Sequence, residues 1–149
     1  MISPRKIYRN VLASIEWVRA LNAGTRDYAA AMLFHLQHAE EYAGKLIPDV
    51  ALLRASALRA RNDFAALREA ALRATAAIDR DKKMKPADKD YMKAFLWALC
   101  EPVSDSFADE ERQMLTFDIA HVDLSKVSRH NLMNFALLEH PEWQAQNSN

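Results

Sequence analysis

The stretch between Pro48 and Pro86 constrains the fold most, because it contains no glycine or proline and repeats small or apolar residues every three and four positions. In heptad register these residues form two rows. The first row holds Val50, Ala57, Phe64, Ala71 and Ile78, and the second holds Leu53, Ala60, Leu67 and Ala74. Two such rows make a narrow apolar seam along a helix, and they predict that a partner helix packs against it.

The whole chain has the composition of a helical protein. Only two glycines, Gly24 and Gly44, occur among its 149 residues, against an average usage of about 7 %. Half of the residues are hydrophobic, and a chain of this length can bury one sizeable core. We therefore predict an all-α protein, a compact bundle of five to seven helices, with stacked antiparallel helical hairpins as one arrangement. A single domain is expected over residues 1–143, and a polar tail over 144–149.

Five prolines mark the expected helix boundaries, because proline suits the first turn of a helix and breaks its interior. Ser3 and Pro4 begin a first helix that ends near Gly24. Its apolar face is predicted to hold Ile7, Val11, Ile15, Val18 and Leu21. Thr25 caps a second helix that Pro48 stops, and these two helices are expected to form an antiparallel hairpin.

The segment after Pro48 has two interpretations. Asn62 and Asp63 are better helix caps than interior residues. Either one helix spans 49–81, or two shorter helices meet near Arg61. Residues 61–72, a small polar turn and an aromatic before an Ala-rich stretch, resemble the turn and second helix of a tetratricopeptide-type hairpin. They lack the usual turn glycine of that family, and the resemblance implies no function.

A charged connector, residues 79–85, precedes Pro86, and a helical pattern follows it. This pattern ends at Pro102, which cannot continue a helix. Its apolar stripe holds Tyr91, Met92, Phe95, Leu96 and Leu99. The connector is therefore expected to be exposed, and the helix after it to pack on the core.

The last third of the chain predicts two more helices with a link between them. Ser104 or Ser106 caps the first of these helices. Alternation of apolar and polar residues over 115–122 favours an extended segment. Ser125 or Ser128 begins the last helix. Its apolar residues are Leu132, Phe135 and Leu138.

The net charge is zero, but the charges are segregated along the chain. Residues 1–26 carry a net +4, residues 27–50 carry −3, residues 51–93 carry +5 and residues 94–149 carry −6. Basic and acidic segments could pack side by side, or one surface could be offered to a partner of opposite charge. We favour internal complementarity.

Cys100 is the one cysteine, so no internal disulfide can form, and a reducing cytoplasm fits the sequence best. Charged residues interrupt the first 17 positions, so no signal peptide is expected. No apolar run approaches the roughly 20 residues that span a bilayer. We therefore expect a soluble protein that does not associate with membranes.

Arginines and lysines in the middle of the chain form the main candidate contact surface. With Trp143 they are the residues predicted to contact a partner or a nucleic acid, namely Arg54, Arg59, Arg61, Arg68, Arg73, Lys82, Lys83 and Lys85. Phosphate binding needs several cations on one face, and single strands also need aromatic stacking platforms. Aromatic residues are sparse in this region. The alternative is a solvated face whose arginines pair with acidic parts of the chain.

His35, His38 and Glu41 are three residues apart and could converge on a metal ion on one helix face. The chain has no Glu-x-x-His or His-Glu-x-x-His motif, so we predict no metal and no cofactor. Cys100 and His121 are the best residues for catalysis, but only sequence neighbours accompany them, so no catalytic residue is predicted.

The sequence therefore favours a non-enzymatic helical protein-interaction module, either an adaptor, an inhibitor or immunity-type binder, or a small subunit of a larger complex. A protein partner is expected, and self-association through the Ala-rich seam is a subsidiary prediction. The alternative is a nucleic-acid-associated helical protein that uses the Arg- and Lys-rich segment 54–93.

Overall fold

Proline and asparagine residues set the helix boundaries in the computed structural model, which describes residues 4–25 and 29–132. The α-helices are α1 (Pro4–Thr25), α2 (Ala29–Ala43), α3 (Pro48–Ala60), α4 (Phe64–Arg80), α5 (Pro86–Leu99) and α6 (Asp109–Leu115). Three 3-10 turns, η1 (Glu101–Ser106), η2 (Ile119–His121) and η3 (Leu124–Lys126), connect or follow them. The described residues contain no strand, so the predicted all-α class is confirmed.

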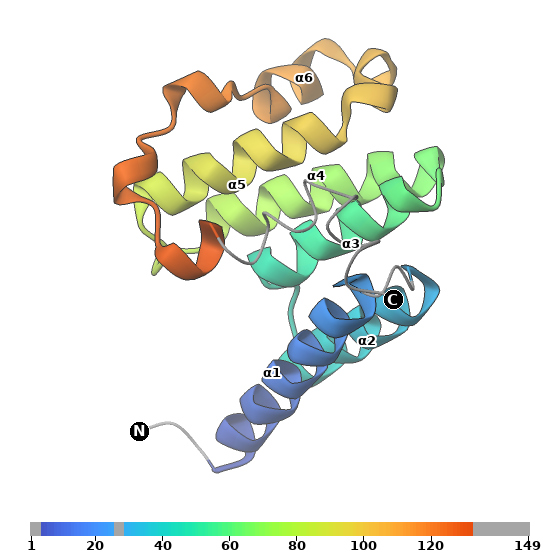
Figure 1. Ribbon diagram of the computed structural model, residues 1–149, viewed down its shortest axis with the longest axis vertical. Coiled ribbons are helices and arrows are strands. Elements are labelled where there is room, and N and C mark those ends of the chain that lie inside the picture. The colour runs from blue at the N-terminus through green and yellow to red at the C-terminus, as the bar shows by residue number, and fades with distance from the viewer. Residues whose placement is uncertain (1–3, 26–28, 133–149) are drawn as a thin grey trace.

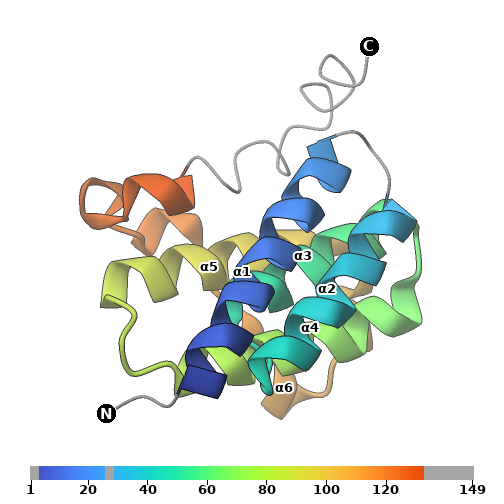
Figure 2. The ribbon, with the colours of Figure 1, turned by 90° about the horizontal axis from the view of Figure 1, so that it is seen from below.

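Consecutive helices pack as antiparallel neighbours (Figure 1). α3, α4 and α5 lie side by side, and α6 with the 3-10 turns covers α4 and α5 on the side away from α1 and α2. The α1–α2 hairpin crosses beneath α3 and extends away from it. Figure 2 shows this hairpin from below, with both helices in front of the other helices. α1 packs mainly on α2, and α2 is the helix that joins this hairpin to α3.

The chain breaks at Asn62, which decides between the two interpretations of segment 49–81. Asn62 has a φ of 57°, in the left-handed region that asparagine tolerates better than most residues. Asp63 then caps α4, since its carboxylate accepts a hydrogen bond from the Ala66 N–H at 3.3 Å. Two helices therefore replace one long helix, and the two halves of the predicted seam face each other across the α3–α4 hairpin.

α3 forms the centre of the core. Nearly every side of this helix is buried, because α2, α4 and α5 all contact it. Its buried residues include Val50, Leu52, Leu53, Ala55 and Ala57. Two residues of the predicted seam, Ala60 and Phe64, lie at the turn and are exposed, so the prediction was wrong for these two positions. The remaining residues of the seam are buried against other helices of the same chain.

Two predicted boundaries of α1 and α2 differ from the structure. Thr25, expected to cap the second helix, is the last residue of α1. α2 ends at Ala43, before Pro48, because Gly44 adopts a φ of 75° and its N–H donates to the Glu40 carbonyl at 3.0 Å. A glycine with positive φ just after a helix is a common way to stop it.

The acidic last third also departs from the prediction. Ser104 and Ser106 donate to carbonyls inside η1 and do not cap α6. The Glu111 carboxylate instead accepts from the Ala108 N–H at the start of α6. The extended segment predicted over 115–122 contains η2, because the Asp118 carboxylate accepts from the Ala120 N–H and turns the backbone.

The last described residues are fixed to α5. The Ser128 N–H and hydroxyl donate to the two carboxylate oxygens of Asp88, at 2.7 and 2.6 Å. Helical backbone follows over residues 129–132, as predicted for a helix that begins at Ser128. Phe135, Leu138 and the tail lie outside the described residues. In the described part of the chain, no helix has both the length and the apolar character needed to cross a bilayer.

The predicted apolar face of the first helix was wrong at three of its positions, whereas Leu21 packs against the core as predicted. Val11, Ile15 and Val18 are 51, 42 and 53 % exposed. The buried face of α1 holds smaller residues and one acid, namely Ala13, Glu16, Ala20 and Ala23. These small residues let α1 approach α2 closely, which turns the aliphatic row outward.

Candidate functional site

Four of the five predicted arginines make contacts inside the molecule. Arg54 and Arg73 both donate to the Glu40 carboxylate of α2, at 2.7 and 2.5 Å. Burial raises the pKa of Glu40, but the hydrogen bonds and positive charges of the two guanidinium groups outweigh burial and hold it below its ordinary value. Glu40 therefore joins α2 to α3 and α4, which supports internal charge complementarity for these residues.

Arg59 and Arg68 also have internal partners. Arg59 donates to the carbonyls of Ala98 and Leu99, at 3.0 and 3.2 Å, where α5 leaves its last carbonyls without helical partners. Arg68 donates to Glu111 at 2.7 Å, and its guanidinium lies 5.5 Å from the Phe107 ring centre. These contacts tie α3 to α5 and α4 to the acidic segment.

The remaining predicted cations lie at opposite ends of α4. Arg61 precedes this helix, whereas Lys82, Lys83 and Lys85 follow it. All four are exposed. The 17 residues of α4 separate the two groups by about 25 Å along the helix axis. The structure therefore does not bring them together into one track for phosphates. Trp143, the remaining predicted contact residue, lies outside the described residues.

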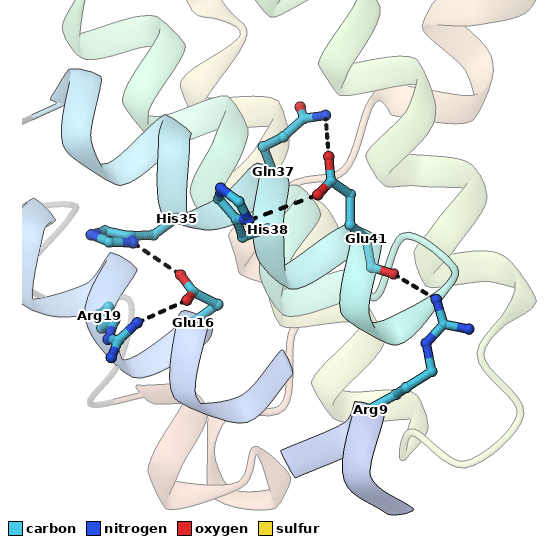
Figure 3. A network of polar contacts seen from close by, with 7 residues as sticks. All are labelled: Arg9, Glu16, Arg19, His35, Gln37, His38 and Glu41. Carbon is cyan, nitrogen blue, oxygen red and sulfur yellow. Dashed lines mark hydrogen bonds and ion pairs between the residues drawn. The ribbon is translucent and has the colours of Figure 1, made fainter. Parts of the chain in front are cut away.

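His35 and His38 point to different carboxylates (Figure 3). His35 Nδ1 lies 2.9 Å from Glu16 Oε2 on α1, and His38 Nδ1 lies 3.7 Å from Glu41 Oε2. Glu41 also accepts from Gln37 at 3.2 Å. In residues 4–25 and 29–132, no group of three metal-ligating side chains converges. Of these three residues, His35 and Glu41 instead join α2 to α1, through Glu16 and Arg9 respectively.

Cys100 is fully buried, and burial raises the pKa of its thiol to about 12 against the opposing charge of Arg59. A thiol with this pKa carries almost no thiolate near neutral pH and is a poor nucleophile. His121 is exposed, and its acidic neighbours Asp118 and Asp123 accept from the backbone N–H groups of Ala120 and Ser125. Among residues 4–25 and 29–132, neither Cys100 nor His121 is therefore joined to an acid–base partner.

The candidate site is the outer face of α1. Val11, Ile15 and Val18, which we call the α1 row, follow one another at intervals of four and three residues. At about 100° per residue they lie within about 60° of one another on the helix surface. Hydropathy found this row but assigned it to the core. The signal against that assignment is the competing row of Ala13, Ala20 and Ala23, whose small side chains allow closer helix packing.

The comparisons with known proteins identify no relative of this chain, so a proposal of function rests on the fold and the candidate site. No family model matches the chain, and neither the curated proteins nor the solved structures compared with it include a match.

Proposed function

We propose that this protein is a non-enzymatic helical protein-interaction module, an adaptor, inhibitor or small subunit, and that the α1 row is its docking surface. One observation carries the proposal, the exposure of three aliphatic side chains in helical register on one face. Scattered apolar residues on a surface need no explanation, whereas a contiguous apolar patch is typical of an interaction site.

The residue types in the α1 row support a surface that is covered in use. Valine and isoleucine are branched at Cβ and lose side-chain freedom in a helix, so they are weaker helix formers than alanine or leucine. On a half-exposed face, packing within the molecule compensates for this only in part. Full burial of such a side chain is worth about 1.5–3 kcal/mol. Since each is about half exposed, a partner gains about 1 kcal/mol from covering each one.

The shape of the row favours a helical partner. Spacings of four and three residues place Val11, Ile15 and Val18 at alternating core positions of a heptad. Such a narrow seam is typical of helix-to-helix packing. Because α1 packs mainly on α2 and the hairpin extends away from α3 (Figure 1), a third helix would form a three-helix unit with them.

Affinity capture from native cell lysate, with and without nuclease, tests the proposal. The tagged protein is compared with the Val11→Ser/Val18→Ser variant and with the matched control Ile119→Ser/Leu124→Ser, which alters two residues that are 52 and 50 % exposed elsewhere. A protein that survives nuclease, remains with the control and is lost with the Val11/Val18 variant supports docking on the α1 row.

Two results would contradict this proposal. Retention of every partner by the Val11/Val18 variant would remove the α1 row as the docking surface. Loss of every partner after nuclease would favour the nucleic-acid alternative through the cations of segment 54–93. Circular dichroism melting of each variant separates lost binding from lost folding.

A further inference from the structure

We infer that the α1 row receives an acidic amphipathic helix of a different protein. This inference rests on the proposed function and adds the chemistry of the partner. It starts from the charge of α1, where Arg19 lies beside the apolar row. Charge complementarity across an interface selects a partner of opposite sign and raises the association rate.

Glu16 is the only acidic residue of α1, and it is not exposed to a partner. It is 6 % exposed, and both of its carboxylate oxygens are engaged. One oxygen accepts from Arg19 at 3.0 Å, and the other lies 2.9 Å from His35 Nδ1. Figure 3 shows Glu16 between these two side chains. The Glu16 carboxylate is therefore held inside the α1–α2 hairpin and is not offered on its outer face.

The exposed charge next to the α1 row is positive. Arg19 follows Val18 and lies four residues after Ile15, so it borders the row, and its side chain is 58 % exposed. Arg9 lies about 120–180° from the row around the helix axis, and it donates to the Glu41 carbonyl of α2 at 3.2 Å, so Arg19 is the described cation that borders the row. With a net +4 over residues 1–26, this end of the chain repels basic partners. Glutamate at the flanking positions of an incoming helix would reach Arg19.

This charge disfavours two other occupants of the row. A second copy that docked by α1 on α1 would place two basic segments against each other, at a cost from like charges. A lipid surface favours a wide apolar face with exposed aromatic anchors. Among the α1 side chains that the structure describes, the exposed large apolar ones are the three aliphatic members of the row, and Trp17 is half-buried against the core.

Binding of two synthetic helical peptides tests the inference. Both carry Leu at the a and d positions of three heptads, with Ala elsewhere, and they differ only at the e and g positions, which hold Glu in one and Lys in the other. Fluorescence anisotropy measures their affinity for the full chain. We expect the Glu peptide to bind at least about tenfold more tightly than the Lys peptide. We also expect that preference to shrink between 50 and 500 mM salt.

Variants of the protein locate the contact. Val11→Ser/Val18→Ser should abolish binding of the Glu peptide. Arg19→Gln should weaken that binding about threefold, whereas Arg80→Gln, which alters an exposed arginine of α4, should leave it unchanged. Equal losses for both arginine variants would overturn the role of charge at the α1 row.

Other outcomes separate this inference from the proposed function. Equal affinity for both peptides, or no binding of either, overturns the acidic-helix inference even when capture still depends on Val11 and Val18. A dimer in sedimentation velocity that dissociates in the Val11/Val18 variant identifies a second copy and overturns it. Binding to phosphatidylcholine–phosphatidylserine vesicles that requires both valines overturns it in favour of a membrane. Capture that is independent of both valines overturns the proposed function itself.

Discussion

The two hairpins, α1–α2 and α3–α4, are built from similar helices but use their apolar residues in opposite ways. In α3–α4 the aliphatic residues of the seam are buried, with Leu53, Leu67 and Ile78 fully enclosed. In α1–α2 the buried residues of α1 are mainly alanines, and the β-branched aliphatic side chains of the α1 row face outward. The comparison teaches that small residues can set the contact face of a helix and leave a more hydrophobic row for another purpose.

Thiol labelling gives the largest expected contrast between the two hairpins. Cys100 is fully buried and its pKa is raised to about 12, so it should react with a thiol reagent at pH 8 only when the protein opens. A thiol introduced by Val18→Cys should react at least about a thousandfold faster, since that position is 53 % exposed. Absorbance at 412 nm with Ellman's reagent should show one fast and one slow thiol. Two slow thiols would mean that the α1 row is covered in the free protein.

Truncation in α3 should have the next largest effect. Leu53 is fully buried at the centre of the core, so Leu53→Ala should lower the free energy of unfolding by about 2–5 kcal/mol through lost burial and a cavity. Urea unfolding followed by circular dichroism measures this loss. The matched control is Leu124→Ala, at a position that is 50 % exposed. A loss below about 1 kcal/mol for Leu53→Ala would contradict the central place of α3.

These contrasts show what the sequence could predict. Gly, Pro and Asn positions determine local backbone conformation, so the all-α class, a connector before Pro86 and the break near Asn62 were accessible as predictions. The predicted start of the connector at Asp79 was wrong, because α4 continues to Arg80. The outward face of α1 could not be predicted. Hydropathy identifies the most apolar row of a helix, but it does not show which row packs against the neighbouring helix. Likewise Arg54 and Arg73 formed a plausible phosphate surface until Glu40 of a distant segment was placed between them.

Acid should weaken the α3–α5 region by a smaller amount. Burial raises the pKa of Asp88, but the hydrogen bonds from Ser128 and Asn131 outweigh it and hold that pKa below its ordinary value, as Arg54 and Arg73 do for Glu40. A carboxylate whose pKa is lower in the folded state than in the unfolded state stabilises the fold when it is ionised. This contribution is fully present above the unfolded-state pKa and is lost as the pH falls through the folded-state pKa. The free energy of unfolding should therefore decline below about pH 4.

Substitutions identify the carboxylates responsible for that decline. Asp88→Asn and Glu40→Gln should each make the acid decline of the unfolding free energy shallower, as measured by urea unfolding at a series of pH values. Asp49 has the opposite effect on the pH dependence of the unfolding free energy. Burial raises its pKa, so the cost of its buried charge is relieved as the pH falls. Asp49→Asn should therefore steepen the decline. An unchanged pH profile in all three variants would contradict these assignments.

The smallest effect on stability is expected where the effect on binding is greatest. Val11→Ala and Val18→Ala remove side chains that are about half exposed and replace them with a better helix former. The lost burial and the gained helix propensity oppose each other, so each substitution should change the free energy of unfolding by less than about 0.5 kcal/mol. Capture of the partner should nevertheless fall for both. A loss above about 1.5 kcal/mol, within the range for burial of a whole side chain, would show that the α1 row belongs to the core of the free protein, and the contrast between the two hairpins would disappear.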